Sequence, residues 1–387
     1  MPEDAVAGVF RRDLFELLKG LHPGFLRFPG GCIIEGNTLE NRYRWKESVG
    51  RPESRRNNFN RWAVHDTKQE SGFHTCYSHY NQSLGLGYYE YFLLCELIGA
   101  QPLPVLNVGL ACQYQAFEQA IHAKYPEMRL IGSAGPDITS ERYTAAWDFY
   151  KEAAPKKENF VYAVDEHYYV KPEWFYEHTD FYDAYPRNIK VFSGEYAAHP
   201  VNGMNRPDAN TLGGALAEAA FLTGVERNAD VVVLASYAPL FARVGYAQWS
   251  PDMIWFDDAR AYGTPSYYVQ KLYGENLGTV TLAMEGQEKA LREQEIYANA
   301  SFDEAAGEII VKVVNHSAQA RELSLRLAES YAPVGAVKLS RISGCEEDYN
   351  CITNPDVVTL QTAEEPFAGS LTLPAFSFTV ARIPVRA

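Results

Sequence analysis

The sequence predicts a (β/α)8 barrel of the TIM type, followed by an antiparallel β-sandwich. Up to about residue 272, short apolar runs alternate with amphipathic helical stretches, which indicates a parallel sheet with helical crossovers. Polar residues follow several of the apolar runs, as in barrels whose strand ends carry the active site. After about residue 278 short alternating segments predict antiparallel strands. We therefore expect a barrel over residues 1–278 and a sandwich over residues 279–387.

The barrel region divides into regular elements. Helices are expected at residues 12–21, 88–99, 117–125, 140–154 and 211–223, with Gly99 as a C-terminal stop and Ser140 as an N-cap. Strands are expected at residues 24–28, 103–108, 128–132, 160–164, 190–192 and 230–236. They are apolar throughout, as expected for strands buried on both faces. A doubly wound sheet would fit these elements too, and the many polar strand ends favour the barrel.

The C-terminal region has the short strands of a sandwich. These are expected at residues 308–314, 323–327, 357–360, 370–373 and 376–383. Cys345 and Cys351 lie close enough in the sequence to bridge a loop, with two free thiols as the alternative.

Composition excludes several kinds of partner. The formal charge is −14, from 35 basic and 49 acidic residues, so nucleic acid and anionic lipid are not expected to bind. No apolar run reaches membrane-spanning length, and the first residues lack the order of a signal peptide. As written, the chain is expected to be soluble and cytoplasmic. A secreted or periplasmic location stays open if a leader precedes it, and a homo-oligomer is also open.

Glu195 is the principal candidate for chemistry. It follows the predicted strand at 190–192 and Gly194, and a carboxylate there is expected to point into the barrel mouth. A structural carboxylate paired with Arg27 is an equal alternative. Strand alternation places Asp165 and His167 on one face and Glu166 on the other.

Other side chains extend the candidate site. His167 is expected to bind a sugar hydroxyl or orient Glu195, with a purely structural histidine as the alternative. Tyr246, Gln248 and Trp249 form a candidate sugar platform, and Trp249 would equally fit between barrel and sandwich.

A series of motifs occurs in a fixed order along the chain. They are Arg27-Phe-Pro-Gly-Gly-Cys-Ile-Ile-Glu-Gly, Tyr43-Arg-Trp-Lys, Leu86-Gly-Tyr-Tyr-Glu-Tyr, Leu106-Asn-Val-Gly-Leu-Ala-Cys-Gln, Val164-Asp-Glu-His-Tyr-Tyr, Val191-Phe-Ser-Gly-Glu-Tyr-Ala, Ala235-Ser-Tyr-Ala-Pro-Leu-Phe, Trp249-Ser-Pro-Asp-Met-Ile-Trp-Phe and Thr264-Pro-Ser-Tyr-Tyr. Together, from about Leu14 onward, they resemble the α-L-arabinofuranosidases of glycoside hydrolase family 51. The resemblance implies a retaining, two-carboxylate mechanism without metal or other cofactor. It implies that Glu195 is the nucleophile.

The resemblance also implies a pocket for the terminal arabinofuranose. Its expected lining residues are Arg27, Cys32, His167, Tyr169 and Gln248. Asn107, at the end of another predicted strand, is included as a substrate-binding residue.

One part of the family pattern is missing. The second carboxylate should be the Glu of an Asn-Glu pair on the fourth strand, and the sequence contains no Asn-Glu dipeptide. The strand expected at 103–108 matches the family's third, and only about 20 residues separate its end from the next expected strand, at 128–132. Two βα steps need on the order of 60 residues. We expect an internal deletion near residues 115–116 and an absent first strand, which leaves six barrel strands. Glu35, Glu118 and Glu166 are weak candidates to replace the acid.

The resemblance predicts a hydrolase that removes terminal non-reducing α-L-arabinofuranosyl groups from arabinose-containing glycans, with the acid step impaired. The first alternative is a non-catalytic sugar-binding protein or inactive fragment with the same pocket. A second is an unrelated barrel enzyme, which would need phosphate-binding glycines or metal carboxylates at the last strands.

Overall fold

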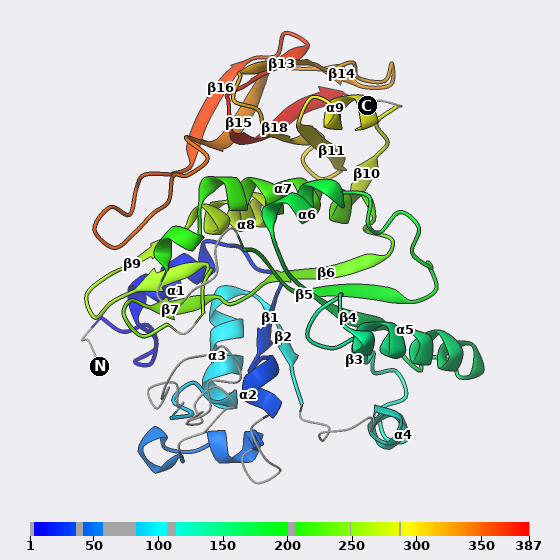
Figure 1. The fold of residues 1–387 in the computed structure, drawn as a ribbon, viewed down its shortest axis with the longest axis vertical. Coiled ribbons are helices and arrows are strands. Elements are labelled where there is room, and N and C mark those ends of the chain that lie inside the picture. The colour runs from blue at the N-terminus through cyan, green and yellow to red at the C-terminus, as the bar shows by residue number, and fades with distance from the viewer. Residues whose placement is uncertain are drawn as a thin grey trace. The chain divides into compact units, whose positions relative to one another are not determined.

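A computed structural model of the chain describes residues 4–35, 42–56, 83–106, 114–199, 206–247, 249–285 and 288–386. The chain divides into two compact units, Met1–Met128 and Arg129–Ala387. Figure 1 labels the helices and strands of both units. Within the described ranges, no helix combines the length and apolar character needed to cross a bilayer.

The first unit is built on a short parallel sheet. Its elements are α1 (Arg12–Lys19), β1 (Phe25–Phe28), α2 (Gly31–Glu35), α3 (Tyr88–Ile98), β2 (Gln101–Pro104) and α4 (Tyr114–His122), with 3-10 turns at Trp45–Ser48 and Pro52–Ser54. Strands β1 and β2 pair in parallel, and α3 packs against both. Gly99 ends α3 with φ +78°, which confirms the predicted stop, because glycine adopts this conformation without steric cost. The strand expected at 103–108 is instead observed at Gln101–Pro104, and residues 107 and 108 lie outside the described ranges.

The second unit begins with a four-stranded parallel sheet in the order β3-β4-β5-β6. Its elements are β3 (Ile131–Ser133), α5 (Glu141–Ala153), β4 (Ala163–Val170), α6 (Pro172–Glu177), β5 (Lys190–Ala198), α7 (Leu212–Arg227), β6 (Val232–Tyr237), β7 (Phe241–Arg243), β8 (Ile254–Phe256), β9 (Ala261–Gly263) and α8 (Pro265–Glu275). Ser140 caps α5 as predicted, because its hydroxyl accepts a hydrogen bond from the Tyr143 amide.

The C-terminal strands form an antiparallel sheet in the order β10-β11-β12-β18-β15-β16, with β14 beside β18 and a separate β13–β17 pair. Their bounds are β10 (Val280–Leu282), β11 (Ile296–Asp303), β12 (Glu308–Asn315), β13 (Arg321–Ser324), β14 (Ala332–Pro333), β15 (Ala336–Ser343), β16 (Gln361–Pro366), β17 (Ser370–Leu373) and β18 (Ser377–Arg386), with the helix α9 (Glu288–Arg292) after β10. Apolar side chains from β11, β12, β15, β17 and β18 form one buried core.

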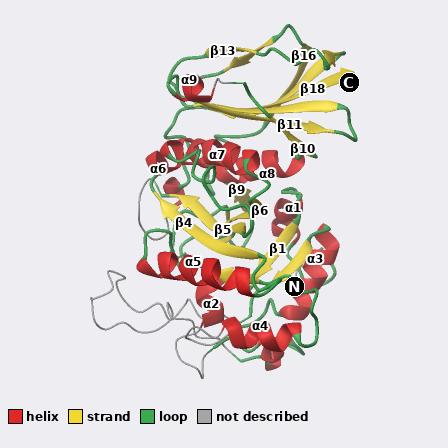
Figure 2. Cartoon of the chain, turned by 90° about the vertical axis from the view of Figure 1, so that its right-hand side faces the viewer, coloured by secondary structure: helices red, strands yellow, loops and turns green. Residues whose placement is uncertain are grey.

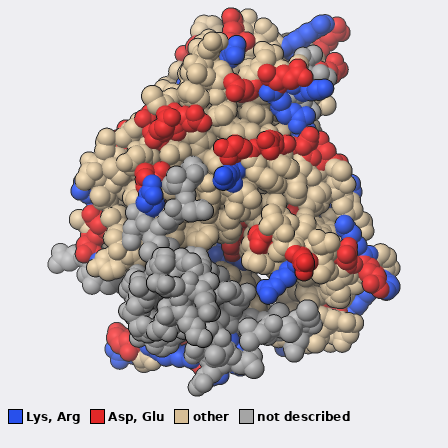
Figure 3. Space-filling model, viewed as in Figure 1, with Lys and Arg blue, Asp and Glu red and all other residues tan. Residues whose placement is uncertain are grey.

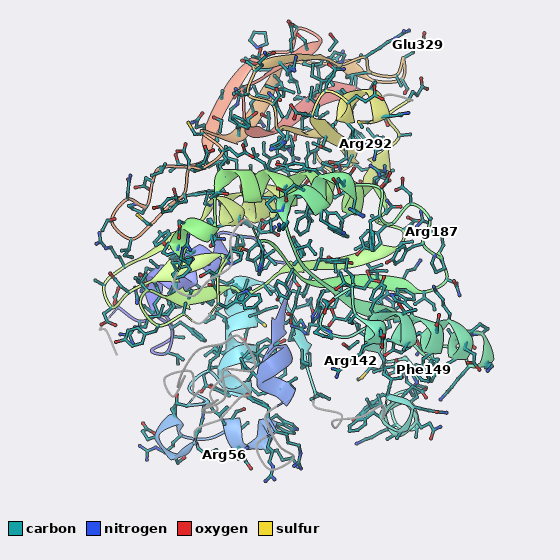
Figure 4. All side chains as sticks on the ribbon, in the orientation of Figure 1. Arg56, Arg142, Phe149, Arg187, Arg292 and Glu329 are labelled. Carbon is teal, nitrogen blue, oxygen red and sulfur yellow. The ribbon has the colours of Figure 1, made fainter. Side chains whose placement is uncertain are left out.

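Helix α7 joins the parallel sheet to the C-terminal sheet. Every residue from Leu212 to Val225 is buried, because the helix contacts β5 on one side and β11 and β12 on the other (Figures 1 and 2). A helix buried all round is mostly apolar or small-sided, and between Leu212 and Val225 the only polar side chains of α7 are Glu218 and Thr223. At the edge of this layer, Arg292 of α9 donates a hydrogen bond to Asp180 at 3.0 Å (Figure 4).

Two expectations for the C-terminal region are wrong. Residues 357–360 form no strand, because both backbone polar groups of buried Val358 bond to the Asn350 side chain instead of a strand partner. The neighbouring strand is β16, whose residues are all exposed and therefore lack the apolar pattern used for prediction. Cys345 and Cys351 are free thiols, so the expected bridge does not form.

Strands β1 to β6 correspond to the six strands predicted for the barrel, and within the described residues they form two open parallel sheets, β1–β2 and β3–β6. We retain the domain boundary near residue 278 as a proposal, since β10, the first strand of the antiparallel sheet, begins at Val280. Figure 3 shows that acidic and basic side chains intermingle on the displayed face of the C-terminal sheets.

Candidate active site

Glu195 lies near the carboxyl end of β5, the strand between β4 and β6. Its side chain is 14% exposed, so a ligand can reach it. The Tyr169 hydroxyl donates a hydrogen bond to Glu195 Oε2 at 2.6 Å. His167 Nδ1 lies 3.5 Å from the same oxygen. Two groups from β4 therefore hold one oxygen of the carboxylate.

A second carboxylate lies behind His167. Asp165 Oδ2 is 3.3 Å from His167 Nε2, so the imidazole sits between two acidic side chains. Asp165 and His167 thus lie on the same face of the sheet, as strand alternation predicted. A histidine in this position is oriented by one carboxylate while it faces the other.

An aromatic wall borders the same place. The rings of Tyr169, His199 and Trp249 meet edge to face, with centroids 5.1 to 5.5 Å apart. The Trp249 indole N–H is buried, and the described residues give it no acceptor. Of the two alternatives for Trp249, the platform beside the strand ends is the one that the ring contacts favour.

Glu166 points to the opposite face of β4, as predicted. It is fully buried and its oxygens lie within hydrogen-bonding distance of five side chains: Tyr143 (2.9 Å), Trp147 (2.6 Å), Tyr168 (2.5 Å), Tyr182 (3.1 Å) and Tyr185 (3.1 Å). Burial raises the pKa of Glu166 to about 7, against the opposing effect of these hydrogen bonds. This carboxyl group is committed to the donors around it and is not placed to act as the missing acid.

Glu118 is also committed elsewhere. It lies on α4 in the first unit, with no side-chain exposure, and its Oε1 is 2.6 Å from His122 Nδ1. The side chain of Glu35 lies outside the described residues. Neither described candidate for a replacement acid is therefore free to take that role.

The structure places the remaining predicted residues unevenly. Arg27 lies on β1 in the first unit, and its pairing with Glu195 stays a prediction. Cys32 lies in α2, but its side chain is outside the described residues, as are Asn107 and Gln248 entirely. His167 and Tyr169 are the two predicted pocket residues found beside Glu195.

Sequence reasoning missed His199. The strand was expected to end at Phe192, whereas β5 continues to Ala198. Along a strand, residues two and four positions after Glu195 share its face, so alternation alone would have identified His199 once the strand length was known.

Barrel enzymes carry their catalytic groups at the carboxyl ends of the strands, where Glu195 lies, and carboxylates are the groups that glycosidases use. The family model described as "Alpha-L-arabinofuranosidase 1 domain" matches residues 17–114 and 110–187, and the one described as "Alpha-L-arabinofuranosidase C-terminal domain" matches residues 194–377. The chain belongs to the α-L-arabinofuranosidases of glycoside hydrolase family 51.

Individual relatives agree. The chain is 35% identical over 347 residues to an extracellular exo-α-L-arabinofuranosidase of Streptomyces chartreusis. The alignment covers 69% of this chain and 38% of that protein. It is 30% identical to α-L-arabinofuranosidase 2 of Arabidopsis thaliana, over 93% of this chain and 58% of that protein. The chain thus spans about two fifths to three fifths of the length of these relatives.

Solved structures show the same fold. An arabinose-bound family 51 α-L-arabinofuranosidase aligns with a TM-score of 0.74 at 24% identity, over 97% of this chain and 67% of that chain. The arabinose complex of the Thermotoga maritima α-L-arabinofuranosidase gives 0.68 at 16% identity, over 98% and 91%. The predicted fold class, a TIM-type barrel followed by a C-terminal β-domain, is confirmed by these neighbours.

Proposed function

We propose that this chain binds terminal α-L-arabinofuranosyl groups of arabinose-containing glycans and forms a covalent glycosyl intermediate on Glu195. The observation that carries the proposal is the double engagement of Glu195 Oε2 by Tyr169 and His167. A hydroxyl donating to a carboxylate stabilises its ionised form, which is the form that attacks an anomeric carbon. Family membership supplies the sugar class.

The same proposal assigns the pocket. His167 and Tyr169 contact the proposed nucleophile, and Trp249, whose ring packs edge to face against Tyr169, borders the place proposed for the sugar. Arg27, Cys32, Asn107 and Gln248 are proposed to complete the pocket on the strength of the sequence motifs alone.

The leaving group must depart without a dedicated acid. A retaining enzyme places a second carboxyl group roughly 5 Å from the nucleophile to protonate the leaving oxygen. The sequence has no Asn-Glu dipeptide, Glu118 is paired with His122, and Glu166 is enclosed by its donors. We therefore propose that turnover depends on the leaving group's own acidity.

A leaving-group comparison tests this function. We expect slow release of nitrophenol from 4-nitrophenyl α-L-arabinofuranoside. We expect almost no release of arabinose from arabino-oligosaccharides. Efficient cleavage of oligosaccharides, abolished by Glu118→Ala or Glu35→Ala, would show that a surviving glutamate acts as the acid.

The stereochemistry of the azide product tests the role of Glu195. In the native chain, azide should attack the glycosyl-enzyme, so two inversions give the α-L-arabinofuranosyl azide. In Glu195→Ala, azide should replace the nucleophile and give the β-anomer by one inversion. An α-azide from both proteins would exclude Glu195 as the nucleophile.

The absent acid favours one alternative, a sugar-binding protein that no longer cleaves. That function predicts saturable binding of an arabinofuranoside with no nitrophenol release, with or without azide. Binding calorimetry and the release assay on the same preparation separate the two functions.

A further inference from the structure

Strand β5 contains one more residue than its neighbours at the place where it carries Glu195. On β4, Glu166 pairs with Ser193 and the next residue, His167, pairs with Glu195, so Gly194 has no partner. On β6 the step from Ala235 to Tyr237 spans two residues, whereas the matching step on β5, from Ser193 to Tyr196, spans three. Gly194 is therefore the extra residue of a β-bulge.

The bulge decides which face of the sheet Glu195 occupies. Paired residues of parallel strands share a face, so Phe192, opposite Asp165, lies on the site face. Strict alternation from Phe192 would turn residue 195 to the other face, where Glu166 is enclosed. The extra residue reverses the alternation and brings Glu195 to the face of His167.

Two side chains hold the bulge. The Ser236 hydroxyl donates a hydrogen bond to the Gly194 carbonyl at 2.7 Å. Asp165 covers the Gly194 Cα so closely that an added Cβ would lie 1.8 Å from its Oδ1. Glycine is thus required here by contact. The carbonyl at the bulge has its hydrogen bond from a side chain of the neighbouring strand.

We propose that Ser236 is a positioning residue, which through the Gly194 carbonyl fixes the bulge that aims Glu195 at the substrate. Its described contact is with the backbone carbonyl of Gly194. This inference deepens the proposed function, and its kinetic test rests on that function.

The kinetic test compares three hydroxyl variants. Ser236→Ala removes the donor and Ser236→Thr retains it. Ser193→Ala removes a buried hydroxyl of β5 that has no hydrogen-bond partner in the described structure. A displaced nucleophile slows bond formation more than binding, so Ser236→Ala should lower kcat for nitrophenol release at least about tenfold with KM little changed. Ser236→Thr and Ser193→Ala should retain near-native kcat. Equal kcat in Ser236→Ala and Ser193→Ala would overturn the proposal.

A chemical test needs no enzymatic activity. In a Glu195→Cys background, the new thiol should react with iodoacetamide in the folded protein, as judged by peptide mass spectrometry, and adding Ser236→Ala should slow that reaction at residue 195 while Ser193→Ala should not. If the native chain releases no nitrophenol, the proposed function fails and the alkylation rates still judge the bulge. Unchanged alkylation in the Ser236→Ala background would contradict the role of Ser236.

Discussion

Tyr169 and His167, both on β4, approach the same oxygen of Glu195. The Tyr169 hydroxyl makes the shorter contact, a hydrogen bond. A hydrogen bond to a charged group is worth about 1.5–3 kcal/mol. Tyr169→Phe should therefore slow nitrophenol release roughly ten- to a hundredfold, with little change in thermal stability. Tyr185→Phe is the control, because it removes a hydroxyl from the Glu166 face. Equal kinetic losses in both variants would show that Tyr169 has no specific role at Glu195.

Glu218 of α7 gives a prediction of pH dependence. It is fully buried, and burial raises its pKa to about 8, although the Ala198 amide donates to its Oε1 at 2.9 Å. The folded protein thus retains a proton that the unfolded chain releases near pH 4.5. The stabilisation of the folded state by this protonated carboxyl group is present in full below about pH 4.5. It is lost as the pH rises through about 8.

Glu218→Gln should remove that dependence. Relative to the native chain, the variant should gain on the order of 4 kcal/mol between pH 5 and pH 9. Urea unfolding at pH 5, 7 and 9 measures the difference, with Glu152→Gln, an exposed glutamate on α5, as the control. Parallel pH profiles for native and Glu218→Gln proteins would refute the assignment.

At the scale of elements, Glu166 links β4 to α5 and to the segment after α6. Four of its five neighbours are hydroxyls and the fifth is an indole N–H, which only donates. Glu166→Gln would turn an amide N–H2 toward these donors, so we expect a loss of about 2–3 kcal/mol in the free energy of unfolding. Tyr185→Phe should cost about 1 kcal/mol. A neutral Glu166→Gln variant in urea titrations would mean that the carboxylate is not required.

Several elements were predictable from local chemistry. Three features depend on local residue type and were predicted correctly: the hydroxyl cap at Ser140, the backbone freedom of Gly99 and the apolar stretch at Val191–Phe192. The bulge at Gly194 was not, because a bulge is defined by the pairing of three strands and one sequence cannot show a register. Strand β16 was missed because its edge position leaves every residue exposed.

The candidate site was also predictable only in part. Glu195, His167 and Tyr169 were identified from motifs and alternation, and they do meet. The role proposed for Ser236 could not be predicted, since its bond to the Gly194 carbonyl depends on a contact between strands distant in sequence. His199 was missed because the end of β5 was placed too early.

At the scale of the molecule, a buried ion pair fastens the C-terminal sheet to α7. Lys312 of β12 is 1% exposed and pairs with Glu226, which also accepts a hydrogen bond from Asn299 at 2.6 Å. Burial lowers the pKa of Lys312, so its charge depends on the partner. Glu226→Ala should destabilise the protein by about 3–5 kcal/mol, because it leaves a buried charge uncompensated.

A double-mutant cycle checks this pair. Lys312→Met combined with Glu226→Ala should recover much of the loss, since methionine fills a similar volume without a charge. Additive losses measured by urea unfolding would mean that the two side chains do not depend on each other.

The chain as a whole spans only part of the length of its relatives, and the proposed function depends on a single carboxylate, Glu195. The central claim is that Glu195 is the nucleophile. Incubation with a cyclic sulfate analogue of α-L-arabinofuranose, whose sulfate departs without being protonated, followed by digestion and mass spectrometry, tests it most directly. We predict one covalent adduct on Glu195, prevented by excess arabinofuranoside and absent from Glu195→Gln. An adduct on another residue, or none on a protein shown to bind the analogue, would contradict it.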